Sequence, residues 1–140
     1  MTPDMSVRAT NTGESSFTIE TGSGHSITLS GMPENQGPRP MEMLLVGLAG
    51  CAGVGILSIL RKMRQNVTNY EVRVRGERAD TDPKVFTTIY VEHIFTGSNL
   101  QAESIQRAID LDTTDYCGAN VMLSTSATIK HSFQIKEASA

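Results

Sequence analysis

Hydrophobic and polar residues alternate in three short stretches at the start of the chain, residues 5–10, 15–20 and 25–30. The third stretch opens with His25, which falls on its apolar face. A period of two is typical of strands with one buried face, and the turn-forming segments NTGE and TGSG separate the stretches. The pattern predicts three strands in a meander, followed by a proline-rich loop, MPENQGPRP.

The pattern then changes to eighteen residues without a charge, MLLVGLAGCAGVGILSIL. Pro40 suits the first turn of a helix, and Glu42 lies near the positive end of its dipole. Arg61 and Lys62 lie near the negative end, so one long helix over residues 40–65 is predicted. A run of this length also meets the usual signal for a membrane span. Because the flanking segments alternate like soluble strands, we expect a helix buried in a core and no membrane partner.

The second half of the chain predicts a mixture of strands and helices. Residues 70–75 and 86–95 have the period of strands, and residues 99–110 have helical spacing. A short apolar helix, ANVML, follows, and residues 128–135 alternate again as a closing strand. Segregated strands and helices are typical of the α+β class. A length of 140 residues with 39% hydrophobic content fits one domain, residues 1–140.

Glycines in the long helix indicate how it is buried. Gly47, Cys51 and Gly55 are spaced by four residues and therefore form one stripe. Each glycine inside a helix costs about 1 kcal/mol relative to alanine, so their small size must permit close approach of another backbone. Dimerisation through this helix is expected, with Cys51 at the close approach. The alternative is that Cys51 is an inert buried residue, because free cysteine often behaves as a small hydrophobe.

The second cysteine, Cys117, stands at the predicted start of the short helix. Unpaired N–H groups at a helix start favour a thiolate, whereas the alternative is a plain helix-cap or turn cysteine. Two cysteines that both neighbour glycine and both lie near helices suggest a pair in which one thiol attacks a peroxide and the other resolves the product. Cys51 and Cys117 are the only cysteines of the sequence.

Composition limits the other classes of function. Two cysteines are too few for a thiol-based zinc site and the three histidines lack ligand spacing, so neither a metal nor a cofactor is expected. His93 and His131 fall on apolar strand faces and, like His25, are expected to be core or half-buried residues. No basic tract accompanies the net charge of −3, so no nucleic-acid partner is expected. The N-terminus lacks the layout of a signal peptide, which favours a cytoplasmic location.

Three segments of the chain together resemble the OsmC/Ohr family of thiol peroxidases. They are GPRPMEMLLVGLAGCAGVGILSILRKMRQ, KVFTT and AIDLDTTDYCGANVML, in that order. The resemblance implies an intertwined homodimer in which long central helices are wrapped by mainly antiparallel sheets from both subunits. It also implies that Cys51 is the peroxidatic and Cys117 the resolving cysteine. The implied substrates are organic hydroperoxides, and an external dithiol of the lipoyl type is the implied reductant.

The sequence departs from the family pattern beside the expected thiolate. Family members carry a glutamate ten residues before the peroxidatic cysteine, where this chain has Met41. Glu42 is the nearest carboxylate, although one residue rotates a helical side chain by about 100°. The usual arginine of the first hairpin is also missing, and Arg39 or Arg8 could replace it. These departures leave open a second function, a dimeric binding protein for an apolar or acyl ligand.

Apolar walls for an alkyl tail are expected from three adaptable methionines. They are Met41, Met43 and Met122.

Overall fold

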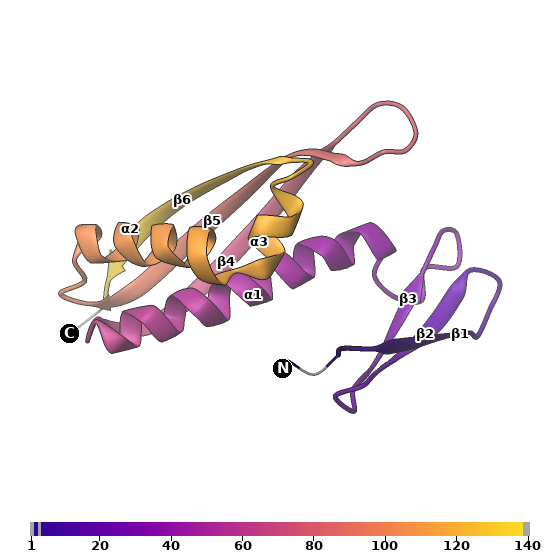
Figure 1. Cartoon of the computed structure of the whole chain (residues 1–140), viewed down its shortest axis with the longest axis horizontal. Helices are drawn as coiled ribbons and strands as arrows, with labels where there is room; N and C mark the ends of the chain where they lie inside the picture. The colour runs from indigo at the N-terminus through magenta and orange to yellow at the C-terminus, as the bar shows by residue number, and fades with distance from the viewer. Residues whose placement is uncertain (1, 3, 139–140) are drawn as a thin grey trace. The chain divides into compact units, whose positions relative to one another are not determined.

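The computed structural model describes residues 2 and 4–138, and the chain forms two compact units, residues 1–44 and 45–140 (Figure 1). The elements in chain order are β1 (Val7–Asn11), β2 (Ser16–Thr21), β3 (Ser26–Ser30), α1 (Pro40–Lys62), β4 (Asn66–Arg78), β5 (Phe86–Ser98), α2 (Ala102–Leu111), a π-helical turn (Asp112–Tyr116), α3 (Gly118–Leu123) and β6 (Thr128–Glu137).

The first unit contains an antiparallel meander, with strand order β1-β2-β3. The predicted three strands are therefore confirmed. The carboxylate of Glu34, in the loop after β3, ties this loop to the first hairpin. It accepts hydrogen bonds from Ser16 Oγ at 2.6 Å and from the backbone N of Ser15 at 2.9 Å. These bonds stabilise the charged form, so the pKa of Glu34 is lowered.

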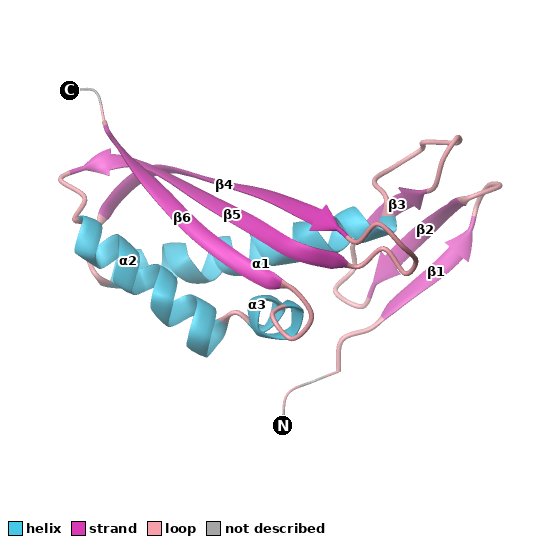
Figure 2. Ribbon diagram, turned by 90° about the horizontal axis from the view of Figure 1, so that it is seen from above, coloured by secondary structure: helices cyan, strands magenta, loops and turns pink. Residues whose placement is uncertain are grey.

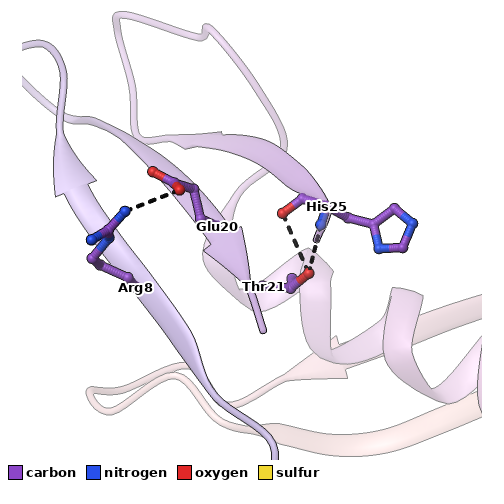
Figure 3. A network of polar contacts seen from close by, with 4 residues as sticks. All are labelled: Arg8, Glu20, Thr21 and His25. Atoms are coloured by element: carbon purple, nitrogen blue, oxygen red, sulfur yellow. Dashed lines mark hydrogen bonds and ion pairs between the residues drawn. The ribbon is translucent and has the colours of Figure 1, made fainter. Parts of the chain in front are cut away.

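Two polar contacts mark the exposed side of the meander (Figure 3). Arg8 of β1 lies opposite Glu20 of β2, and their side chains form an ion pair at 3.1 Å. In the turn between β2 and β3, Thr21 Oγ1 accepts a hydrogen bond from the backbone N of His25 at 3.0 Å. His25 is exposed in this turn, so its prediction as a core or half-buried residue is wrong. A turn residue has no sheet neighbour to cover it, whatever its spacing.

Helix α1 begins and ends on the signals that predicted it. Pro40 is its first residue, and Glu42 Oε1 accepts a hydrogen bond from the backbone N of Arg39 at 2.8 Å. This is the reciprocal half of a capping box, which satisfies a free donor at the helix start. The helix ends at Lys62, and Arg64 follows with a φ of 59°, a left-handed conformation common after helix ends. The prediction of one long helix is confirmed.

The second unit is built on the sheet β4-β5-β6, in which β5 pairs antiparallel with β4 and parallel with β6. The helices of this unit lie on one face of that sheet, as Figure 2 shows. Ile89, Val91, His93 and Phe95 of β5 are all buried, as their shared face predicted. The buried stripe of α1 consists of Leu48, Ala52, Ile56 and Leu60. Hydrophobic burial on this face is the main stabilising term of the unit.

The glycines of α1 divide into two groups. Gly53 and Gly55 have close neighbours, because a Cβ at Gly53 would lie 3.6 Å from Val72 Cγ2 and a Cβ at Gly55 would overlap Asp112 Oδ1. At Gly47 and Gly50, by contrast, no atom of the described chain would lie within 4 Å of an added Cβ. The close approach predicted for the stripe therefore occurs within this chain at Gly55, while the other end of the stripe is open.

Helix α1 remains unusually apolar for a helix with so much exposed surface. Among the described residues it is the one helix long and apolar enough to cross a membrane, with a mean hydropathy of 2.3 over an 18-residue window of which 22% is buried. The combination of two sheets and three helices confirms the predicted α+β class.

Candidate functional site

Both cysteines lie in the second unit and hold free thiols. Cys51 lies in the middle of α1 and is exposed, whereas Cys117 is the N-cap of α3 and is 1% exposed. The side chain of Cys51 lies close to the Cys117 thiol and raises its pKa. The structure therefore brings together an accessible sulfur and a buried one that lie 66 positions apart in the sequence.

The environment of Cys117 favours the protonated thiol. Burial is the largest cause and raises its pKa to about 11, and the neighbouring Cys51 and the charge of Asp112 act in the same direction. The backbone N–H of Asn120 donates to Cys117 Sγ at 3.4 Å and opposes this shift, but it does not outweigh burial. The prediction that a helix start would favour a thiolate at Cys117 is therefore wrong in net direction, because desolvation exceeds the effect of one N–H group.

A π-helical turn places Asp112 beside the cysteine pair. The backbone N of Cys117 donates to the backbone O of Asp112 at 2.7 Å, and the Asp112 side chain packs against the Cα of Gly55, one helical turn after Cys51. Asp112 is 1% exposed, and its Oδ2 has no hydrogen-bond partner among the described residues. Burial raises the pKa of Asp112 to about 6. Such turns are rare and are frequent at functional sites.

A half-buried series of hydrogen bonds runs from β4 to α3. Tyr70 Oη lies 2.6 Å from His93 Nδ1, and His93 Nε2 lies 2.9 Å from His131 Nδ1. His131 Nε2 in turn lies 2.8 Å from Asn120 Oδ1. The two histidine rings are stacked with centroids 5.2 Å apart. The chain thus ends on Asn120, the residue whose backbone N–H meets the Cys117 sulfur.

Which atom donates in each of these hydrogen bonds follows from the last acceptor, Asn120 Oδ1. Asn120 Nδ2 donates to the backbone O of Thr113 at 3.3 Å, which leaves Oδ1 to accept from His131 Nε2. His131 Nδ1 must then accept from His93, and His93 Nδ1 from the Tyr70 hydroxyl. Both histidines are neutral in this arrangement. Burial agrees with it, because it lowers the pKa of His93 to about 4 and also lowers that of His131.

A cavity of about 560 Å³ opens beside Asp112. Its lining comes from the second half of α1 and from the segment that carries Asp112, and it is mainly apolar. The lining residues are Val54, Gly55, Ser58, Ile59, Lys62, Met63, Leu111, Asp112 and Tyr116. A cavity of this size, with apolar residues and a few polar groups at its wall, suits a small molecule with an alkyl part.

The residues predicted to assist the thiolate have partners in the first unit. The Arg39 guanidinium donates to the backbone O of Ser30 and Gly37, to Asn35 Oδ1 at 2.9 Å and to Met32 Sδ. Glu42 caps the start of α1. Their predicted roles at Cys51 stay predictions. Within the described residues 45–138, no hydrogen bond or ion pair brings an arginine or lysine to either sulfur.

The three methionines predicted to bind the substrate do not line one cavity among the described residues. Met122 is 75% exposed on α3 and is not part of the cavity beside Asp112, which is lined instead by Met63. Met41 and Met43, at the start of α1, are half-buried. A substrate-binding role for these three methionines stays a prediction.

Asp112 and Asn120 were missed by the sequence reasoning, although one of them carries a readable signal. Asp112 continues the apolar helical spacing of Ile105, Ala108 and Ile109, and a carboxylate on the buried face of a helix needs an explanation. Asn120 shows no such signal, because its partners come from distant segments.

The fold and the two adjacent thiols define an α+β protein with a paired-cysteine site on a long glycine-rich helix. Residues 33–132 match the family model of OsmC-like proteins. The chain belongs to the OsmC-like family.

Relatives support this assignment along nearly the whole chain. Protein YhfA of Escherichia coli K12 is 38% identical over 119 residues, which cover 85% of this chain and 89% of YhfA. A crystal structure of a hypothetical protein from Aquifex aeolicus is similar with a TM-score of 0.90 and 28% identity, covering 99% of this chain and all of that one. An organic hydroperoxide resistance protein OsmC from Legionella pneumophila shares the fold, with a TM-score of 0.72, 16% identity and coverage of 94% and 97%. The predicted OsmC-like fold is confirmed.

Proposed function

We propose that this protein reduces organic hydroperoxides, with Cys51 as the peroxidatic and Cys117 as the resolving cysteine. The observation that carries the proposal is the proximity of an exposed thiol on α1 to a buried one at the start of α3, close enough for Cys51 to raise the pKa of Cys117. The Legionella relative, named an organic hydroperoxide resistance protein, supports the same chemistry.

The proposed reaction needs the accessible sulfur first and the buried one second. The Cys51 thiolate attacks the distal oxygen of the hydroperoxide, forms a sulfenic acid and releases an alkoxide. The Cys117 sulfur then attacks the Cys51 sulfur, so that a disulfide forms and water leaves. An external dithiol reduces the disulfide through a mixed disulfide. The assignment follows exposure, because Cys51 is the exposed thiol of the pair and Cys117 the buried one.

The thiolate and the developing alkoxide require nearby positive charge. We propose Arg39 for this role and keep Glu42 as the carboxylate that would orient it, as their positions before Cys51 in the sequence indicated. Replacing Arg39 by methionine should slow the oxidation of Cys51 without preventing the formation of the disulfide. Lysine at this position tests whether charge alone suffices.

A homodimer is part of the proposal. Val46 and Val54 are 54% and 75% exposed on α1, and the helix surface at Gly47 and Gly50 is open in the described chain. An apolar surface that a glycine stripe flattens suits close packing of a second copy of the same helix. Sedimentation equilibrium should therefore give twice the mass of one chain. Replacing Gly47 by leucine should shift the equilibrium toward single chains.

Turnover with a dithiol tests the proposed function. Wild-type protein should consume cumene hydroperoxide in the presence of dihydrolipoamide, and Cys51→Ser should abolish the activity. Cys117→Ser should still lose its Cys51 thiol in one turnover but should not form an intramolecular disulfide. Consumption of peroxide by the Cys51→Ser variant at the wild-type rate would show that another group does the chemistry.

A second candidate, a binding protein for an apolar or acyl ligand, is favoured by the cavity of about 560 Å³ beside Asp112. Native mass spectrometry of freshly purified protein distinguishes the two. A copurified lipid together with thiols that resist peroxide would support the binding protein, whereas an empty protein with reactive thiols would support the peroxidase.

A further inference from the structure

Asp112 is a buried ionisable group whose charge acts on Cys117 and which the proposed reaction leaves without a role. It is 1% exposed, and Oδ2 has no hydrogen-bond partner among the described residues. A buried carboxyl oxygen without a partner costs folding free energy. The π-helical turn from Asp112 to Tyr116 and the missing side chain at Gly55 nevertheless make room for it.

The position of Asp112 connects three parts of the site. Its side chain packs on α1 at Gly55, one helical turn beyond Cys51, and its backbone O holds the backbone N of Cys117. Its charge also acts on the Cys117 thiol. Asp112 also lines the apolar cavity, together with Val54 of α1. Asp112 therefore borders both the cavity and Cys117.

Few other titratable groups face Asp112. Those that sense its charge are Tyr70 of β4 and Cys117, and those that share its cavity are Lys62 of α1 and Tyr116. Tyr70 donates to His93, and burial raises the pKa of its hydroxyl well above the ordinary value, so it stays protonated. Asp112 is thus the group in this set that can exchange a proton near neutral pH, because burial brings its pKa to about 6.

We propose that Asp112 is the proton shuttle of the two-thiol site, giving a proton to the alkoxide that leaves the peroxide and then taking the proton of Cys117. This inference rests on the proposed function and names the acid and base that the reaction needs. This role explains why a carboxyl oxygen is buried without a hydrogen-bond partner among the described residues, since a paired carboxylate would be a poor acid.

The proton balance closes over the cycle. In the first step the Cys51 thiolate attacks the distal oxygen, the O–O bond breaks, and the Asp112 carboxylic acid protonates the alkoxide to an alcohol. In the second step the Asp112 carboxylate takes the Cys117 proton, and the Cys117 thiolate displaces hydroxide from the Cys51 sulfenic acid. The proton then passes from Asp112 to the hydroxide, which leaves as water. Reduction of the disulfide by an external dithiol returns the Cys51 thiolate and the Cys117 thiol and releases one proton, which restores the acid form of Asp112.

The choice of oxidant tests this role. Cumene hydroperoxide releases a strongly basic alkoxide that needs a proton, whereas peracetic acid releases acetate, which does not. At pH 6, Asp112→Asn should oxidise Cys51 about 100-fold more slowly with cumene hydroperoxide, the usual effect of a lost general acid. With peracetic acid, its rate should stay within about threefold of wild type, because no acid is needed. A structural defect would slow both oxidants alike.

Matched controls separate the shuttle from other effects. Asp115→Asn removes an exposed carboxylate from the same turn and should leave both rates unchanged. In wild-type protein, D₂O should slow the reaction with cumene hydroperoxide and leave that with peracetic acid unchanged, a measurement that does not depend on the variant being folded. Equal isotope effects for both oxidants, or an Asp112→Asn variant that loses both rates equally or neither, would overturn the shuttle. Wild-type thiols that react with neither oxidant would instead reject the proposed function.

Discussion

Replacing Asp112 by asparagine should change how the stability of the protein depends on pH. The carboxyl group is buried, and desolvation raises its pKa from 3.8 to about 6. An acid with a raised pKa in the folded state stabilises the fold fully below its unfolded pKa, and this stability is lost as the pH rises through the folded pKa. Wild-type protein therefore loses the contribution of Asp112 between about pH 4 and pH 7.

The size of the effect follows from the same two values. One pKa unit corresponds to about 1.4 kcal/mol, so ionisation of Asp112 costs the folded state about 3 kcal/mol relative to the unfolded chain. Asparagine cannot ionise, so the unfolding free energy of the Asp112→Asn variant does not suffer this decrease as the pH rises. The difference in unfolding free energy, Asp112→Asn minus wild type, should rise by about 2.5 kcal/mol between pH 4 and pH 7.5, because part of the loss has already occurred at pH 4.

Urea unfolding followed by circular dichroism measures this difference, because the chain has no tryptophan. Protein concentration must be equal in all samples if the fold is a dimer. The lowered pKa values of His93 and His131 give the opposite slope, since they stabilise the fold above about pH 6.5 and lose this effect as the pH falls. They cancel in the difference. A difference that stays constant with pH, or that Asp115→Asn reproduces, would refute the reasoning.

Three further predictions concern the thiols, the glycine stripe and the buried histidines. In reduced protein, iodoacetamide should modify Cys51 well before Cys117, because Cys117 is 1% exposed and burial raises its pKa to about 11. Peptide mass spectrometry measures the two rates, and equal rates would contradict the burial of Cys117. Gly55→Ala should be less stable than Gly53→Ala by about 1–3 kcal/mol in urea unfolding, because the added Cβ overlaps a carboxyl oxygen in the first variant and makes ordinary contact at 3.6 Å in the second. In NMR titrations, His93 should stay neutral until the pH approaches about 4, whereas a midpoint near the ordinary value of 6.5 would show that the hydrogen-bond chain is open to solvent.

The order of strands and helices could be predicted because local pattern decides it. Helix α1 has proline at its start, Glu42 in its first turn and basic residues at its end, and each of these acts within one turn of the helix. The alternation in β5 likewise predicted the buried face that carries His93. Signals of this range can be read from one sequence, since they do not depend on what the other elements contribute.

The site could be predicted only where its residue types are rare. Two cysteines in 140 residues attracted attention, and the structure places them together. The state of Cys117 was mistaken, because burial by distant segments outweighs the local helix start. The connection between His93 and His131 also escaped prediction, since it depends on the parallel pairing of β5 with β6, which no local pattern specifies.

The central claim is that Cys51 and Cys117 form one redox pair within a chain. Reduced protein treated with one equivalent of cumene hydroperoxide should lose both thiols and two hydrogen masses. Peptide mapping without reductant should then give a single Cys51–Cys117 crosslinked peptide from the monomer band of a denaturing gel. Protein that keeps both thiols, or that forms only disulfides between chains, would contradict the account.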